Sequence, residues 1–170
     1  DQDNDGTLRI AGTVRILQGA YLDVRPGVTL EFGPHGRILV ERGGRLRCDE
    51  ATLTSACHAM WQGIEVQGTR DAAQTPTYGN ALQGWLQLFN STVEHAHVAV
   101  LGGRRLQPAD DHAGGVVQVI GTTFRNCGLD VDIRPSRNLV NGLELATASY
   151  LNNNHHITDD QLIDHTYWDG

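Results

Sequence analysis

The sequence contains no lysine. All 13 of its basic residues are arginine, and 20 acidic residues give a net charge of -7 at pH 7. No arginine-rich run is present that could follow a phosphate backbone, so we do not expect nucleic acid as a partner. Three explanations of the arginine bias stay open: genome composition, adaptation to heat or salt, and use in stacked ion pairs.

Long apolar runs are also missing. No stretch approaches the roughly 20 residues needed to span a bilayer, and the first residues lack the charged, apolar and small-residue order of a secretory signal. We therefore expect no membrane insertion. A chain of this length buries a real core, and one domain over residues 1–170 is the simplest division.

Cysteine is scarce, with only Cys48, Cys57 and Cys127 in the chain. Three cysteines cannot all pair with one another, and none forms the C-x-x-C unit of a metal or redox site. Two interpretations stay open. Cys48 and Cys57 form a disulfide, or the cysteines pack as small buried hydrophobic residues.

Short bursts of alternating apolar and polar residues fill the chain from Gly6 to Ser55. Glycines and Gly-Pro or Pro-Gly pairs separate the bursts and favour tight turns. The alternation has the period of two that is typical of strands with one buried face, and no amphipathic helix fits it. The predicted strands are TLRIAG, TVRIL, AYLDV, VTLEF, RILVE, RLRCD and ATLTS.

An internal repeat distinguishes a stacked solenoid from a sandwich or a barrel. LFNSTVEHAHVAV (88–100) aligns without gaps on VIGTTFRNCGLDV (119–131), and a looser copy runs from ATLTSAC through GIEV. Units that cannot bury their own apolar face are stabilised by stacking on neighbours of the same kind. The predicted apolar columns pair Val93 with Phe124, Ala96 with Cys127, Val98 with Leu129 and Val100 with Val131, and they include Leu53, Ile64 and Val66.

The segments NSTVEHAHVAV, GTTFRNCGLDV and MWQGIEVQG resemble right-handed parallel β-helix (pectate-lyase-like) repeats of large secreted bacterial proteins. The resemblance covers residues 6–133. It implies an all-β solenoid with coils over residues 7–133, an acidic entry segment at 1–6, and a secreted or cell-surface location. The superfamily includes polysaccharide lyases, glycoside hydrolases, adhesins and proteins without known activity, so the resemblance specifies the fold better than the chemistry.

Two polar, glycine-rich segments, 68–84 and 102–115, are predicted to be loops that project from one corner of the coil. Such insertions often carry function. Residues 134–170 are predicted to cap the open end, because an uncapped solenoid exposes a layer of unpaired strand edges. Thr158 and Gln161 have the spacing of a capping box that opens a short helix in this cap.

Two clusters are candidate metal sites. Asp1, Asp3 and Asp5 precede Gly6 in a D-x-D-x-D-G pattern that suits calcium, but Gly12 stands where a complete EF-hand loop has its glutamate. The pattern is therefore either a calcium site completed from elsewhere or a solvated acidic linker. The second cluster lies in the predicted cap and comprises His155, His156, Asp159, Asp160 and His165. For His95 and His97 we favour structural roles, with His95 and its aligned residue Asn126 at a corner of the coil.

Four residues are candidates for catalysis. Strand alternation predicts that Glu65, Asp130 and Asp132 point to solvent, with Glu65, Ala99 and Asp130 in one outer column and Asp132 beside Arg134. The β-helix resemblance implies that such carboxylates and basic residues hold calcium or perform acid-base work on a sugar chain. The alternative is that they are solubilising surface charges.

Three further residues bear on recognition and packing. Asn90 begins an Asn-Ser-Thr glycosylation sequon, and Tyr78 lies in a predicted loop where its ring could stack on a sugar. Trp61 is predicted to pack against the coil, and Trp85 to begin a strand.

Three functions follow from these features and are left open. The favoured one is a structural or adhesive module that associates end to end with copies of itself or binds cell-surface polysaccharide. The second is a polysaccharide lyase or glycoside hydrolase that uses the outer face. The third is a calcium-dependent glycan-binding module, with calcium as its cofactor.

Overall fold

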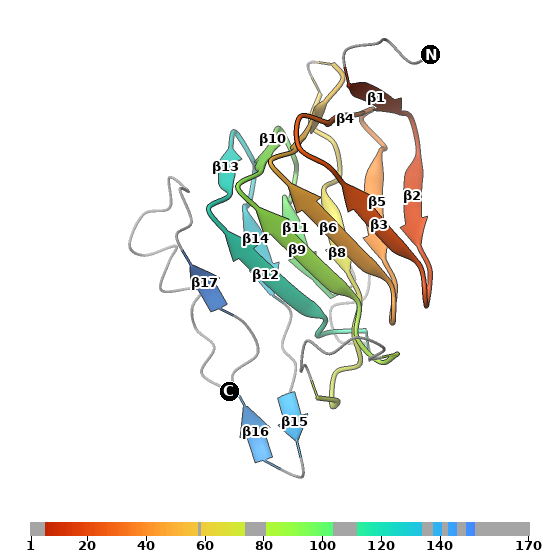
Figure 1. The fold of residues 1–170 in the computed structure, drawn as a ribbon, viewed down its shortest axis with the longest axis vertical. Helices are drawn as coiled ribbons and strands as arrows, with labels where there is room; N and C mark the ends of the chain where they lie inside the picture. Colours follow the sequence, from red (N-terminus) through yellow and green to blue (C-terminus); the bar gives the residue numbers. More distant parts are fainter. Residues whose placement is uncertain are drawn as a thin grey trace.

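The structure is a computed structural model that describes residues 6–57, 59–73, 81–103 and 112–133, together with the backbone of three short strands between residues 138 and 151. The regular elements in these residues are all β-strands (Figure 1). No helix in the described part of the chain is long and apolar enough to cross a membrane.

The strands form three parallel sheets of five strands each, which we call sheets A, B and C. Sheet A contains β1 (Thr7–Ile10), β4 (Thr29–Phe32), β7 (Thr52–Ser55), β10 (Thr92–Glu94) and β13 (Thr123–Arg125). Sheet B contains β2 (Thr13–Ile16), β5 (Arg37–Val40), β8 (Ile64–Val66), β11 (Val100–Gly102) and β14 (Val131–Ile133). Sheet C contains β3 (Tyr21–Val24), β6 (Arg45–Asp49), β9 (Trp85–Phe89), β12 (Val116–Ile120) and β17 (Ser149–Leu151).

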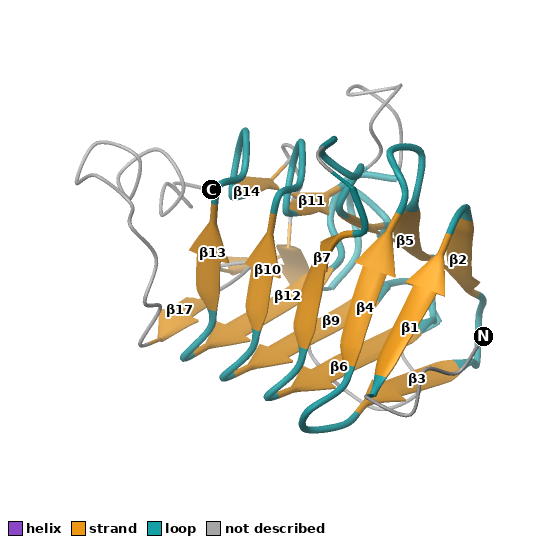
Figure 2. Cartoon of the chain, turned by 90° about the horizontal axis from the view of Figure 1, so that it is seen from above, coloured by secondary structure: helices purple, strands orange, loops and turns teal. Residues whose placement is uncertain are grey.

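The chain visits sheets A, B and C in turn, so each set of three strands makes one coil that stacks on the next. Figure 2 shows the five strands of sheet A side by side, from β1 at the N-terminal end to β13. This arrangement confirms an all-β solenoid of parallel strands. It also confirms the seven strands predicted before residue 56, which are β1 to β7.

The core is a set of apolar columns that run through the coils. In sheet A the inward column is formed by Leu8, Leu30, Leu53, Val93 and Phe124. All of them except Leu8 are buried. Fully burying one such side chain stabilises the fold by about 1.5–3 kcal/mol, so stacking supplies the apolar contact that no single coil has.

The repeat alignment is confirmed at Val93–Phe124 and at Val100–Val131. In the earlier copy the alignment is confirmed for Leu53, which pairs with Val93, but it is wrong for Ile64, which pairs with Val100 rather than with Val98. A shift of two residues keeps every side chain on the same face of a strand, so an apolar pattern cannot detect it. The corner segments 56–63 and 95–99 differ in length, which hides the shift in the sequence.

A sharp corner joins sheet C to sheet A in each coil. Glu50 and Asn90 adopt positive φ values of 47° and 46° there, and Gly27 and Gly121 occupy the same corner with φ of 79° and 62°. Backbone hydrogen bonds connect the corners of neighbouring coils, from Glu50 N to Phe89 O at 2.9 Å and from Asn90 N to Ile120 O at 2.9 Å. Asn90 is therefore a structural corner residue, and its exposed position leaves the glycosylation prediction untested.

Trp61 packs inside the coil, as predicted. Its side chain is 0% exposed, its ring stacks on Phe32 with centroids 4.3 Å apart, and its Nε1 donates to the carbonyl of Glu94 at 2.8 Å. Trp85 begins β9, which confirms the second tryptophan prediction.

The disulfide interpretation of Cys48 and Cys57 is wrong for this structure, because all three cysteines are free. Cys48 points into the core in the same column as Val24 and Leu88, whereas Cys57 is exposed on the loop after β7. Alternation in β6 points the Cys48 side chain to the interior, whereas Cys57 lies on the exposed side of the coil.

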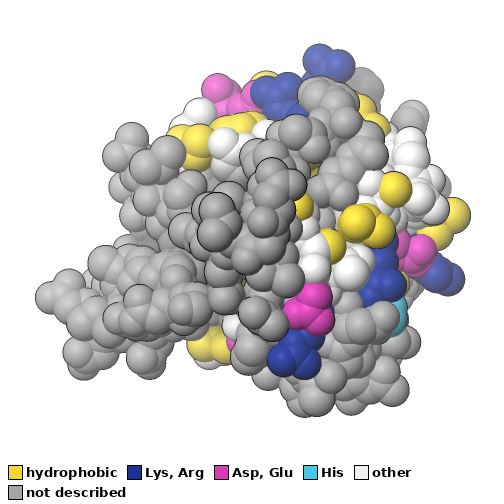
Figure 3. All heavy atoms as spheres, turned by 90° about the horizontal axis from the view of Figure 1, so that it is seen from below, with side chains coloured by type: hydrophobic (Ala, Val, Ile, Leu, Met, Phe, Trp, Pro, Cys, Tyr) yellow, Lys and Arg dark blue, Asp and Glu magenta, His cyan; other side chains and the backbone are white. Residues whose placement is uncertain are grey.

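Arginine and acidic side chains lie against one another between coils. Arg9 donates to Glu31 at 2.9 Å, and Arg15 and Arg125 pair with Glu41 and Glu94. Figure 3 shows acidic side chains next to arginine side chains on the side of the molecule opposite to that of Figure 2. Stacked ion pairs, one of the open explanations for the arginine bias, are thus present.

Part of the predicted C-terminal cap is described as strands. β15 (Asn138–Val140) and β16 (Leu143–Leu145) pair antiparallel, and β17 pairs parallel with β12 and extends sheet C. The predicted helix at Thr158 to Gln161 lies outside the described residues.

Candidate functional site

The outer face of sheet B holds two of the four predicted catalytic residues, Glu65 and Asp132. Its central column runs from Arg15 through Leu39, Glu65 and Leu101 to Asp132. Glu65 is only 6% exposed, and Leu39 and Leu101 are also buried. The prediction that Glu65 points to solvent is therefore wrong. Alternation places Glu65 on the outer face, but the neighbouring side chains leave little of it exposed there.

Two neighbouring side chains hold the carboxylate of Glu65 in place. Gln67 Nε2 donates to Glu65 Oε1 at 3.1 Å, and Arg37 Nη1 lies 3.6 Å from Oε2. A buried charge that is paired and hydrogen-bonded in this way is stable in place. The residues on either side of Glu65 in this column are Leu39 and Leu101, so no second carboxylate lies next to it in the column.

The structure does not bring the catalytic candidates together. Asp132 shares the column with Glu65, but Leu101 separates them, which puts their backbones about 9.6 Å apart at the usual strand spacing. Asp130 precedes β14 and lies outside that column, which corrects the predicted column of Glu65, Ala99 and Asp130. Arg134 lies outside the described residues. Among the described candidates, no acid-base pair is assembled.

A buried glutamine connects the two loops at the corner between sheets B and C. Gln83 is almost fully buried. Its Oε1 accepts hydrogen bonds from the backbone N–H of Thr69 at 3.0 Å and of Gly115 at 3.1 Å. Its Nε2 donates to the carbonyls of Thr69, Ala72 and Ala73, each at 3.2 Å. Both loops follow a strand of sheet B, which confirms their predicted common corner.

Sequence reasoning missed Gln83, because nothing in the segment around it distinguishes this glutamine from an exposed one. Only the folded chain shows that its amide satisfies backbone groups of two successive coils.

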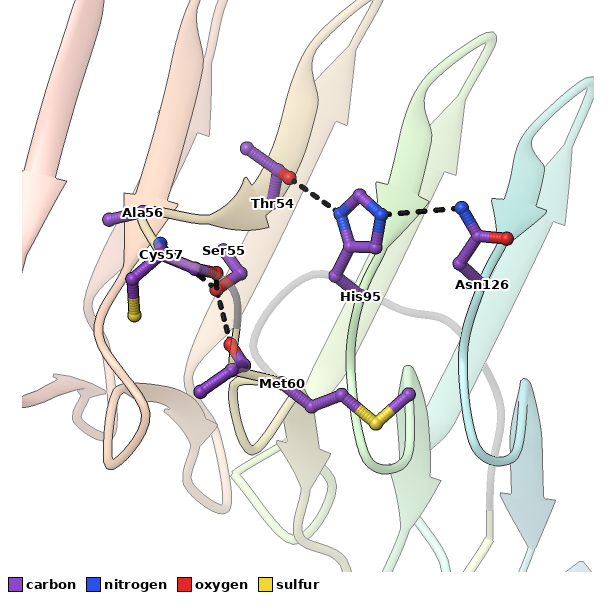
Figure 4. Close-up of a pocket in the computed structure, with 8 residues that line it drawn as sticks. Thr54, Ser55, Ala56, Cys57, Met60, His95 and Asn126 are labelled. Atoms are coloured by element: carbon purple, nitrogen blue, oxygen red, sulfur yellow. Dashed lines mark hydrogen bonds between the residues drawn. The ribbon is translucent and has the colours of Figure 1, made fainter.

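A pocket with a volume of about 450 Å³ lies at the opposite corner, between sheets A and B (Figure 4). The loop after β7 forms one wall, and the corners after β10 and β13 supply His95 and Asn126 as the other. Its polar and sulfur-containing lining residues are Thr54, Ser55, Cys57, Met60, His95 and Asn126.

A chain of hydrogen bonds fixes the His95 ring. Asn126 Nδ2 lies 3.2 Å from His95 Nε2, and Thr54 Oγ1 lies 3.3 Å from His95 Nδ1. An amide nitrogen only donates, so Nε2 accepts and Nδ1 carries the proton and donates to Thr54. The corner position predicted for His95 and Asn126 is confirmed, with φ values of 57° and 54°. Their side chains bond to each other rather than to turn amides.

The same chain continues to Glu94. Burial raises the pKa of Glu94, but the hydrogen bonds from Arg125 and Thr54 and the positive charge of Arg125 outweigh this effect, so the net pKa lies below its ordinary value. Arg125 Nε donates to Glu94 Oε2 at 2.7 Å. Glu94 is therefore ionised at neutral pH and holds Arg125 of the next coil through this hydrogen bond.

The cysteines do not supply a nucleophile for the pocket. Burial raises the pKa of Cys48 to about 12 and that of Cys127 to about 11, so both thiols stay protonated and unreactive. Cys57 is exposed, but Figure 4 shows its sulfur directed away from the His95 ring. Cys57 and His95 therefore do not form a thiol-imidazole pair.

Metal-binding geometry is absent from the part of the chain that the structure describes, where no three His, Cys, Asp or Glu side chains converge. His97 is exposed, and its backbone N–H donates to the Trp61 carbonyl at 2.8 Å. Several predicted site residues lie outside the described residues: Asp1, Asp3, Asp5, Tyr78, His155, His156, Asp159, Asp160 and His165.

The first coil has a different surface from the rest. Strands β1, β2 and β3 are the edge strands of sheets A, B and C at one end. Three of the four exposed large hydrophobic side chains of the described residues belong to this coil, namely Leu8, Leu17 and Tyr21. Leu8 is 50% exposed, whereas Leu30 directly beside it in the column is 5% exposed.

A cation-π column on sheet C also ends at this coil. The Arg45 guanidinium lies 4.1 Å from the centre of the Trp85 ring and 5.0 Å from that of Tyr21. Since β3 is an edge strand, Tyr21 is the outermost member of the column. The first coil therefore presents open strand edges, an apolar rim and an aromatic ring together.

Comparison with protein-family models, with curated proteins and with solved structures finds no match to this chain.

Proposed function

We propose that this chain is a secreted or cell-surface structural module, a rigid β-solenoid that associates end to end through its first coil. The observation that carries the proposal is the exposure of Leu8 in a column whose next members are buried. Within the described residues, the apolar column of sheet A reaches β1 and is exposed to solvent there.

Adding a further coil would complete this end in two ways. It would remove the apolar side chains of the first coil from water, at about 25 cal/mol for each Å² of apolar surface buried. It would also pair the backbone groups of three edge strands, which otherwise act as a template for association. Both effects are those that already join the coils within the chain.

We also propose that the coil is right-handed, like the pectate-lyase-like repeats that the sequence resembles. Connections between parallel strands of one sheet are right-handed in nearly all proteins, and each strand here returns to its sheet after one full coil.

The enzymatic alternative has less support. Glu65 is buried and paired with Arg37, and a catalytic carboxylate has to reach its substrate. The calcium-dependent alternative depends on Asp1, Asp3 and Asp5, and it stays a prediction. A calcium titration followed by thermal unfolding tests it, since a ligand that binds only the folded chain raises its stability.

Light scattering and negative-stain electron microscopy over a range of protein concentrations test the proposal. We expect particles whose length grows with concentration in steps of one molecule. The variant Leu8→Ser should stay monomeric, while Leu82→Ser, which changes a leucine of similar exposure (53%) that is not part of the first coil, should assemble normally. A wild-type chain that is monomeric at every concentration would refute the function.

A further inference from the structure

We draw no further inference here: the strongest candidate, the outer face of sheet C around Tyr21, Arg45 and Trp85, carries none, because these side chains stack on one another and nothing in the structure shows what would cover that face.

Discussion

Replacing Trp61 by alanine should destabilise the fold more than any other tryptophan substitution in the described residues. The ring is fully buried and stacks on Phe32. Large-to-small changes of buried aromatic residues cost about 3–5 kcal/mol. A domain of this size is stabilised by about 5–15 kcal/mol, so the variant should lose a large share of its stability.

Two further variants separate the contributions of the Trp61 ring and its N–H group. Trp61→Phe keeps an aromatic ring against Phe32 but loses the donor to the Glu94 carbonyl, and a buried acceptor left without its partner costs about 1–3 kcal/mol. Trp85→Ala removes a half-buried ring that packs on Arg45, and it should cost less than Trp61→Ala.

Urea denaturation followed by circular dichroism and by tyrosine and tryptophan fluorescence measures these differences, and coincident transitions show that unfolding is cooperative. Solenoids can unfold in parts, so this check comes before any free energy is quoted. A loss below about 1 kcal/mol for Trp61→Ala, against the 3–5 kcal/mol usual for buried aromatics, would show that the corner is not packed as described. An equal loss for Trp85→Ala would contradict the difference in burial.

Gln83→Leu should lower the free energy of unfolding by about 2 kcal/mol or more, because it leaves the backbone N–H groups of two loops without acceptors. Limited proteolysis should then cut these loops faster than in the wild-type chain. An unchanged cleavage rate would contradict their connection through Gln83. Glu94→Gln should destabilise the fold at neutral pH but have little effect at strongly acidic pH. The folded-state pKa of Glu94 lies below its ordinary value, so its contribution is present above the unfolded-state pKa and is lost as pH falls through the folded-state pKa. Urea titrations at pH 7 and in acid check the sign, and a difference that grows in acid would rule it out. Cys57 should react with a thiol reagent in the folded chain, whereas Cys48 should react only after denaturation. Mass spectrometry of the labelled peptides tells the two cysteines apart. Labelling of Cys48 under native conditions would mean that the core column is accessible to solvent.

The pocket beside His95 is a well-defined feature without an assigned reaction. Its imidazole uses both ring nitrogens in hydrogen bonds to Asn126 and Thr54, and this arrangement holds three neighbouring coils together at their corner. We interpret the pocket as a consequence of the longer loop after β7, which stands away from the regular corners beside it. The Thr54–His95–Asn126 chain thus connects successive coils of the stack.

The sequence by itself determined the strands and most of their stacking. Alternation identified β1 to β7, and the repeat paired Val93 with Phe124 correctly. Both signals are local: side chains on a strand alternate between two faces, and stacked copies of one unit place equivalent residues side by side. The packing of Trp61 against the coil was also predicted, and the structure places its ring inside.

Only the tertiary structure decided which outer residues meet water and which columns they share. Alternation assigns Glu65 to the outer face, but only the folded chain shows that its side chain is buried there. The pairing of Ile64 with Val100 depends on the path of a corner loop, and a two-residue shift leaves the apolar pattern unchanged. The buried role of Gln83 and the exposure of Leu8 likewise depend on neighbours that only stacking brings together, because burial is a property of the assembled coils and not of any one strand.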